Sequence, residues 1–99
     1  MPKIEEEIET LIDLQEPKMY RVFLHNDDYT TMDFVVEILT RIFHKTTDQA
    51  VEIMLQVHEK GKGLCGVYTY EIAQAKVDQV KQLAKQNEFP LLATMEEDR

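Results

Sequence analysis

The 99-residue sequence has few of the features that usually restrict where a protein works or how it is held together. It has a single cysteine, Cys65, so an internal disulfide is impossible and nothing points to an oxidising compartment. No apolar run approaches the roughly 18 residues of a membrane-spanning helix. The N-terminus has no apolar stretch of the signal-peptide kind. We therefore expect a cytoplasmic protein.

Basic residues are scarce as well. Eleven Lys and Arg stand against 19 Asp and Glu, which gives a net charge of −8 at pH 7. Nucleic acids and anionic membranes are bound by clustered Lys and Arg, so this charge argues against both as main partners. It favours a ligand or partner that carries positive charge. The hydrophobic content of 43% is enough for one small domain with a single core.

The N-terminal segment differs from the rest of the chain because acidic side chains crowd it: Glu5, Glu6, Glu7, Glu9, Asp13 and Glu16. Few large apolar residues accompany them, so residues 1–18 are predicted to form a flexible acidic arm. The folded domain is predicted to span residues 19–95. Residues 96–99 are predicted to form a solvated tail.

Within the domain, hydrophobic patterning predicts six elements. Runs of β-forming residues predict strands at 19–25, 64–70 and 91–95. Apolar residues at helical spacing predict one helix capped by Thr30 or Thr31, a second with a Thr46–Gln49 capping box, and a third over 71–86. The inner side of the third helix is expected to be formed by Ile72, Ala73, Val77, Val80 and Ala84.

The order of these elements is strand, helix, helix, strand, helix, strand. Such a pattern buries its apolar faces best when one antiparallel sheet is covered by the helices. We therefore predict a single α+β domain with a three-stranded antiparallel sheet, covered on one face by three helices.

Three consecutive side chains with oxygen acceptors, Asn26, Asp27 and Asp28, lie where the first strand gives way to the first helix. Asn and Asp dominate turns, so a polar capping turn is one interpretation. A site for a cationic group is the other, because these side chains supply hydrogen-bond acceptors. A calcium loop is not expected, because its alternating ligands, its glycine and its terminal glutamate are missing.

His58 is the other candidate polar group. It shares a helix face with Met54 and Val57, so it lies at the edge of an apolar patch, either as part of the rim of the core or as a ligand-binding group. The three histidines show no short metal-ligand spacing, so neither a metal nor a cofactor is predicted. Asp28 could orient His58 as a base, but no nucleophile stands in a recognisable context. We therefore do not expect an enzyme.

Several separated segments, covering about residues 19–95 in the same order, resemble the signature of the ClpS adaptors. They are Asn26–Thr30 with Met32 and Phe34–Val35, Met54–Leu55 with Val57–His58, Gly61–Lys62 with Cys65–Val67, and Glu88 with Pro90–Leu92.

The resemblance implies an adaptor without enzymatic activity or cofactor. ClpS proteins bind N-end rule substrates, whose first residue is Phe, Tyr, Trp or Leu with a free amino group. They deliver these substrates to the N-domain of the ATP-dependent ClpA or ClpC unfoldase, which feeds the ClpP protease. The resemblance thus implies substrate proteins and ClpA or ClpC as partners.

The resemblance also implies roles for individual residues. Asn26, Asp28 and His58 would hold the substrate's α-amino group, and Asp27 beside them would add negative potential. Met32 would restrict the shape of the first side chain, whose pocket would be formed by Leu24, Thr30, Met32, Val35, Met54, Val57 and Leu91. Glu71 and Lys76 resemble the unfoldase-docking face. His25 departs from the family's usual aliphatic residue, which affects the expected shape of one pocket wall.

One alternative function stays open at this stage. The C-terminal domain of the ribosomal stalk protein has a similar fold, so the chain could be an interaction domain without a pocket for an N-terminal residue. A polar clamp beside an apolar pocket would separate the two interpretations, because a docking domain needs neither.

Overall fold

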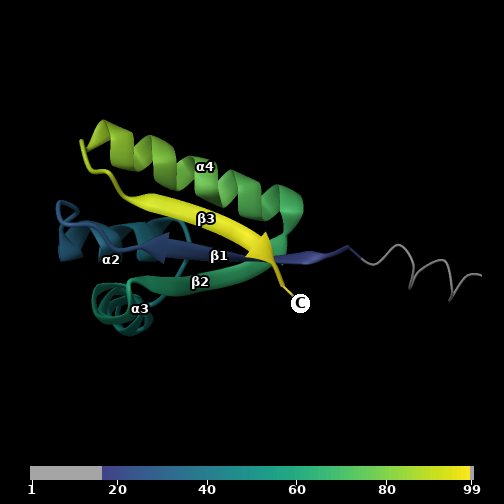
Figure 1. Cartoon of the computed structure of the whole chain (residues 1–99), viewed down its shortest axis with the longest axis horizontal. Helices are drawn as coiled ribbons and strands as arrows, with labels where there is room; N and C mark the ends of the chain where they lie inside the picture. Colours follow the sequence, from purple (N-terminus) through teal and green to yellow (C-terminus); the bar gives the residue numbers. More distant parts are fainter. Residues whose placement is uncertain (1–16, 99) are drawn as a thin grey trace, which may run out of the picture.

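The computed structural model describes residues 17–98 of the chain (Figure 1). Its elements are β1 (Met19–His25), α2 (Met32–Arg41), α3 (Thr47–Lys60), β2 (Lys62–Thr69), α4 (Tyr70–Gln86) and β3 (Leu92–Glu97). This order confirms the predicted α+β fold. Apart from residues 17 and 18, the predicted acidic arm lies outside the described residues.

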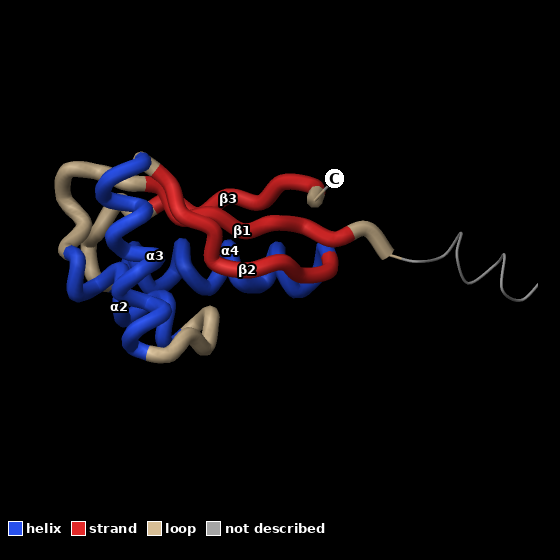
Figure 2. Tube along the Cα trace, turned by 90° about the horizontal axis from the view of Figure 1, so that it is seen from below, coloured by secondary structure: helices blue, strands red, loops and turns tan. Residues whose placement is uncertain are grey.

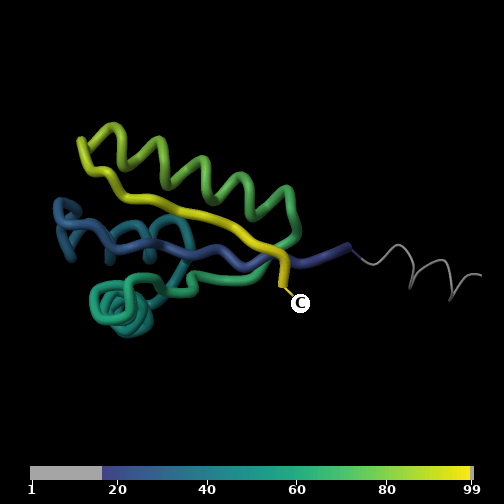
Figure 3. The backbone as a smooth tube through the Cα atoms, in the orientation of Figure 1, coloured from purple at the N-terminus to yellow at the C-terminus, as the bar shows by residue number. Residues whose placement is uncertain are grey.

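The three strands form one antiparallel sheet in the order β2-β1-β3. The backbone tube in Figure 3 shows β1 running between its two partners. Figure 2 shows the helices gathered on one side of the sheet, as predicted. Helix α4 contacts all three strands, whereas α3 packs against α2 and β2.

The helix ends follow the local sequence signals. Thr31 is the N-cap of α2, and its hydroxyl oxygen accepts a hydrogen bond from the Phe34 N–H at 3.1 Å. Thr46 and Gln49 form the predicted capping box at the start of α3. Gly61 ends α3 in the left-handed conformation, with φ of 88°, which only glycine adopts without strain.

The core lies between the inner face of the sheet and the helices. Val22 and Leu24 of β1 are fully buried there, together with Ile38 and Leu39 of α2. Helix α4 adds a buried row of residues: Ala73, Val80 and Ala84.

Ile72 was expected on the inner side of α4, but it is 50% exposed. Each helical residue turns about 100° from the one before. Ile72 therefore points away from the row that begins at Ala73.

Strand β3 reaches into the predicted solvated tail, of which residue 99 lies outside the described residues. Strand β3 continues to Glu97, and the Asp98 N–H donates a hydrogen bond to the Met19 carbonyl oxygen at 2.8 Å. Glu96 lies 3.3 Å from Arg21, and Glu97 lies 3.5 Å from Lys18. The pairing of β3 with β1 thus continues past the last apolar residue, and acidic side chains on β3 lie beside basic ones on and before β1.

Candidate functional site

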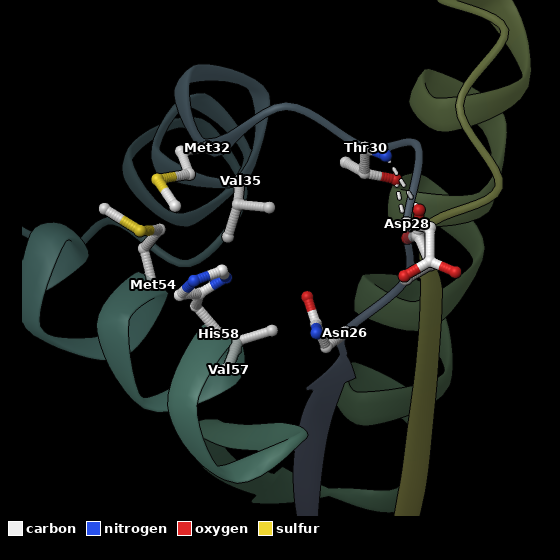
Figure 4. A pocket seen from close by; sticks show the side chains of 9 residues that line it. Asn26, Asp28, Thr30, Met32, Val35, Met54, Val57 and His58 are labelled. Atoms are coloured by element: carbon white, nitrogen blue, oxygen red, sulfur yellow. Dashed lines mark hydrogen bonds between the residues drawn. The ribbon is translucent and has the colours of Figure 1, made fainter.

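A pocket of about 270 Å³ opens where three segments meet: the loop after β1, the start of α2 and the last turns of α3 (Figure 4). It is lined by Asn26, Asp27, Asp28, Thr30, Met32, Val35, Met54, Val57 and His58. All nine belong to the residues that the sequence analysis assigned to the substrate site. The pocket is slightly smaller than the range of roughly 300–1,000 Å³ for drug-sized ligands, so it suits a group about the size of one amino-acid residue.

A backbone contact brings the loop and α3 together. The Asn26 N–H donates a hydrogen bond to the Gly61 carbonyl oxygen at 2.8 Å, which joins the end of β1 to the end of α3. His58 lies three residues before Gly61, in the last turn of the same helix. The left-handed turn at Gly61 therefore positions Asn26 and His58 at one pocket, although 32 residues separate them along the chain.

Asp27 holds the loop in shape. Its carboxylate accepts hydrogen bonds from the N–H groups of Tyr29 and Thr30, at 2.8 and 2.7 Å, and from the Thr30 hydroxyl at 2.7 Å. Both of its oxygens are thereby used within the loop. Asp27 lines the pocket, but its nearest partners belong to its own chain.

These hydrogen bonds also set the acidity of Asp27. Partial burial by itself would raise the pKa of the carboxyl group. The hydrogen bonds from Thr30 and Tyr29 favour the charged form and together outweigh burial, so the pKa is lowered from 3.8. Asp27 is therefore charged throughout the neutral range.

Replacing Asp27 by alanine is expected to destabilise the fold by about 1–3 kcal/mol at neutral pH, because three loop donors lose their acceptor. The folded pKa lies below the unfolded value, so this stabilisation is present above about pH 4 and is lost as the pH falls through the folded pKa. Urea unfolding at about pH 7 and about pH 2.5 should show the difference between wild type and Asp27→Ala shrinking at the acidic pH.

The neighbouring carboxylate provides the control for this prediction. Asp28 is exposed, so Asp28→Ala should change stability by less than about 0.5 kcal/mol. Equal stabilities for Asp27→Ala and wild type at neutral pH would contradict the role given to Asp27.

Three other polar side chains of the pocket are free to accept hydrogen bonds. Asn26, Asp28 and His58 are exposed, and their side chains form no hydrogen bond with any residue from 17 to 98. Asn26 and His58 both project into the hollow in Figure 4, and Asp28 lies on the loop beyond Asn26, across the hollow from His58. An amide oxygen, a carboxylate and an imidazole nitrogen are together suited to a cation with several N–H donors.

The opposite end of the pocket is apolar. Met32 and Val35 come from α2, whereas Met54 and Val57 come from α3. Val35 and Val57 are 6% and 3% exposed, so they form the floor. Met32 is 47% exposed and stands at the mouth, with Met54 near it in Figure 4. The polar and apolar halves thus adjoin in one hollow.

Two residues assigned to the side-chain pocket do not line it in this structure. Leu24 has no exposed surface and belongs to the core beneath the site. Leu91 is 6% exposed and lines a separate groove between α4 and β3. His25 also does not line the pocket, and its Nε2 lies 2.6 Å from the Thr94 hydroxyl oxygen on the neighbouring strand.

Glu71 and Lys76 are not brought together in one pocket. Glu71 is exposed in the first turn of α4, beside a groove that also contains Tyr20 and Tyr70. Lys76 is half-buried, and its Nζ donates a hydrogen bond to the Ile42 carbonyl oxygen at 2.5 Å. Lys76 therefore also ties α4 to the end of α2.

Sequence reasoning missed the supporting glycines. Gly61 appeared only as part of the Gly61–Lys62 segment and Gly63 was not singled out, yet the Gly61 carbonyl oxygen anchors the Asn26 loop and Gly63 lets β2 approach α3 closely. A Cβ atom at Gly63 would lie 2.9 Å from Cγ2 of Val57, which lines the pocket. The pair of glycines flanking Lys62 was the available signal.

Catalytic and metal-binding alternatives gain no support from the geometry. Burial raises the pKa of the Cys65 thiol to about 12, so Cys65 is not a nucleophile near neutral pH. Within residues 17–98, no group of three His, Cys, Asp or Glu side chains is arranged to hold a metal ion. None of the helices in that range is long and apolar enough to cross a membrane.

Comparison with known proteins identifies the family. The family described as ATP-dependent Clp protease adaptor protein ClpS matches residues 15–94. The ATP-dependent Clp protease adapter protein ClpS of Syntrophus aciditrophicus is 63% identical over 84 residues, covering 85% of this chain and 78% of that protein. The protein of the same name from Acetivibrio thermocellus is 61% identical over 88 residues, covering 89% of each.

A solved structure agrees with these sequence matches. Agrobacterium tumefaciens ClpS2, bound to L-phenylalaninamide, superimposes with a TM-score of 0.81 at 35% identity, covering 84% of this chain and all of that one. The family match over residues 15–94 includes the loop, both pocket-lining helices and most of the sheet. The chain therefore belongs to the ClpS family of adaptors of the ATP-dependent Clp protease.

Proposed function

We propose that the pocket binds the first residue of a substrate protein, through a free α-amino group and a large apolar side chain: Phe, Tyr, Trp or Leu. The observation that carries this proposal is the meeting of three unengaged acceptors and an apolar hollow in one pocket of about 270 Å³. The likeness to ClpS2, which was solved with L-phenylalaninamide, supports it. That compound has a free α-amino group next to a benzyl side chain.

The polar half distinguishes a chain terminus from a chain interior. A terminal amino group is mostly protonated at neutral pH and offers three donors. A peptide bond offers one donor and no charge. Asn26, Asp28 and His58 supply three acceptors, and each charge-assisted hydrogen bond contributes roughly 1.5–3 kcal/mol when well placed. An interior peptide segment would leave most of these acceptors desolvated and unpaired.

The apolar half of the pocket selects the side chain of the substrate's first residue. Burying a Leu or Phe side chain against Met32, Val35 and Met54 stabilises the complex by about 1.5–3 kcal/mol. A small side chain loses most of that contribution. A charged side chain adds a desolvation penalty. Both halves are therefore needed for selective binding, and the fold supplies them from different elements.

Delivery is the second part of the proposal. We propose that the bound substrate passes to the ClpA or ClpC unfoldase of the ClpP protease, with Glu71 on the docking face. Glu71 is exposed and lies on α4, outside the residues that line the pocket. Substrate binding and unfoldase docking can therefore be altered separately by substitution.

A degradation assay tests delivery. A Phe-initiated fluorescent protein, incubated with ATP, ClpP and either ClpA or ClpC, should be degraded faster when the chain is present. Glu71→Ala should reduce that acceleration severalfold and leave peptide affinity unchanged, because Glu71 lies outside the pocket. Glu52→Ala, which removes an exposed carboxylate from α3, is the matched control. Glu71→Ala that delivers as fast as wild type would contradict the docking role.

A further inference from the structure

The two methionines of the pocket can be oxidised, a reaction that leucine or valine at the same places would not undergo. Met32 and Met54 stand on different helices and line the same pocket, near one another in Figure 4. Met32 is 47% exposed at the mouth. Of the other described methionines, Met19 is 38% exposed and Met95 is half-buried against the core. The most exposed methionine residue between residues 17 and 98 is thus in the binding pocket.

We propose that Met32, with Met54 beside it, is an oxidant-sensitive modification site that closes the pocket to apolar side chains. This inference rests on the proposed function, since it concerns the apolar half of the same pocket. The oxidant is a peroxide, and the product is methionine sulfoxide.

The chemical step needs no other reactant. The Sδ lone pair of Met32 attacks one oxygen of hydrogen peroxide, and the O–O bond breaks as the S–O bond forms. A proton passes to the departing oxygen, which leaves as water. The sulfur loses two electrons and the peroxide gains them. Methionine sulfoxide reductases reverse the modification.

Oxidation affects binding because it makes the methionine side chain polar. A thioether is flexible and polarisable, and it packs well against aliphatic and aromatic side chains. A sulfoxide carries a strong acceptor oxygen, and a bound Phe or Leu side chain would bury that oxygen without a donor. The polar acceptors at the other end of the pocket, Asn26 and Asp28, contain no sulfur and are not altered by this reaction. Oxidation should therefore weaken binding of the apolar side chain and leave the acceptors for the amino group unchanged.

Peroxide treatment of the full chain tests the inference. Sulfoxide formation at each methionine is followed by mass spectrometry, and binding of a fluorescent Phe-initiated peptide is followed by anisotropy. We expect Met32 to be oxidised before Met95, and affinity to fall roughly 10- to 100-fold as Met32 is converted. Saturating peptide should slow oxidation of Met32 relative to Met19. Sulfoxide reductase should restore affinity.

Leucine variants separate this site from general damage. Met32→Leu/Met54→Leu conserves volume and removes both oxidisable sulfurs, so its affinity after peroxide should match that of its own untreated sample. Met19→Leu, which changes an exposed methionine outside the pocket, should remain as sensitive as wild type. Equal losses in the double variant and wild type would overturn the inference, as would full affinity with Met32 oxidised.

The untreated samples distinguish the two proposals. Untreated wild type that does not bind the peptide contradicts the proposed function, and this inference with it. Untreated wild type that binds, with oxidised wild type that binds equally well, contradicts the modification site alone.

Discussion

Replacing Asp28 by alanine is expected to weaken binding of a Phe- or Leu-initiated peptide by about 10- to 100-fold, with little change in the stability of the fold. Asp28 is the carboxylate of the pocket that accepts no hydrogen bond from residues 17–98, whereas Asp27 is engaged by Thr30 and Tyr29. The lost interaction is a charge-assisted hydrogen bond to an ammonium group. Fluorescence anisotropy with a labelled peptide measures the affinity, and urea unfolding measures the stability.

A second carboxylate tests whether the effect is local. Asp33 lies in the first turn of α2, is exposed and does not line the pocket. Asp33→Ala removes the same charge from the same region, so general attraction of a cationic peptide would fall equally in both variants. We expect Asp33→Ala to bind within about twofold of wild type at moderate salt, where separated exposed charges are screened. Similar losses in the two variants would contradict a direct contact with Asp28.

Replacing Gly63 by alanine is expected to impair both stability and binding. Its Cβ would lie 2.9 Å from Cγ2 of Val57, 3.1 Å from the Ile53 carbonyl oxygen and 3.3 Å from Cγ2 of Ile53. The carbonyl belongs to the helix backbone, so α3 must move away from β2. Overpacking of this kind costs about 1–3 kcal/mol in the free energy of unfolding. Because Val57 and His58 line the pocket, peptide affinity should fall as well.

The next residue along β2 serves as the control. Leu64 faces the helix-free side of the sheet and is 40% exposed, so Leu64→Ala should cost less than about 1 kcal/mol and leave peptide affinity unchanged. Urea unfolding and anisotropy on both variants separate a loss of stability from a displacement of α3. Gly63→Ala that retains wild-type affinity would show that the approach of α3 to β2 does not shape the pocket.

Much of the fold could be predicted because local signals and hydrophobic periodicity agree. Thr46 with Gln49 predicted the start of α3, and the apolar run at 19–25 predicted β1. The predictions failed where tertiary contacts determine the bounds of a helix or strand. Tyr70 was assigned to a strand but begins α4, and β3 continues to Glu97 by pairing with β1, with its carboxylates beside Arg21 and Lys18. Charge pairing across strands leaves no trace in hydrophobic periodicity.

The residues that line the pocket could be named from the sequence, but their arrangement could not. No local pattern links Asn26 to His58, since the link is a backbone hydrogen bond to Gly61. The different roles of the adjacent carboxylates, with Asp27 bound within the loop and Asp28 available to a ligand, also depend on the loop conformation, which turns Asp27 toward Thr30. Burial of Leu24 and Leu91 away from the pocket depends on how the sheet packs against the helices.

The central claim is that the pocket binds a free terminal amino group together with an apolar side chain. Its most direct test compares the affinities of one Phe-initiated peptide and its N-acetylated form, measured by fluorescence anisotropy at neutral pH and moderate salt. Acetylation keeps the side chain but removes the charge and two of the three donors. We expect at least about 100-fold weaker binding of the acetylated peptide. Equal affinity for the two peptides would contradict the account.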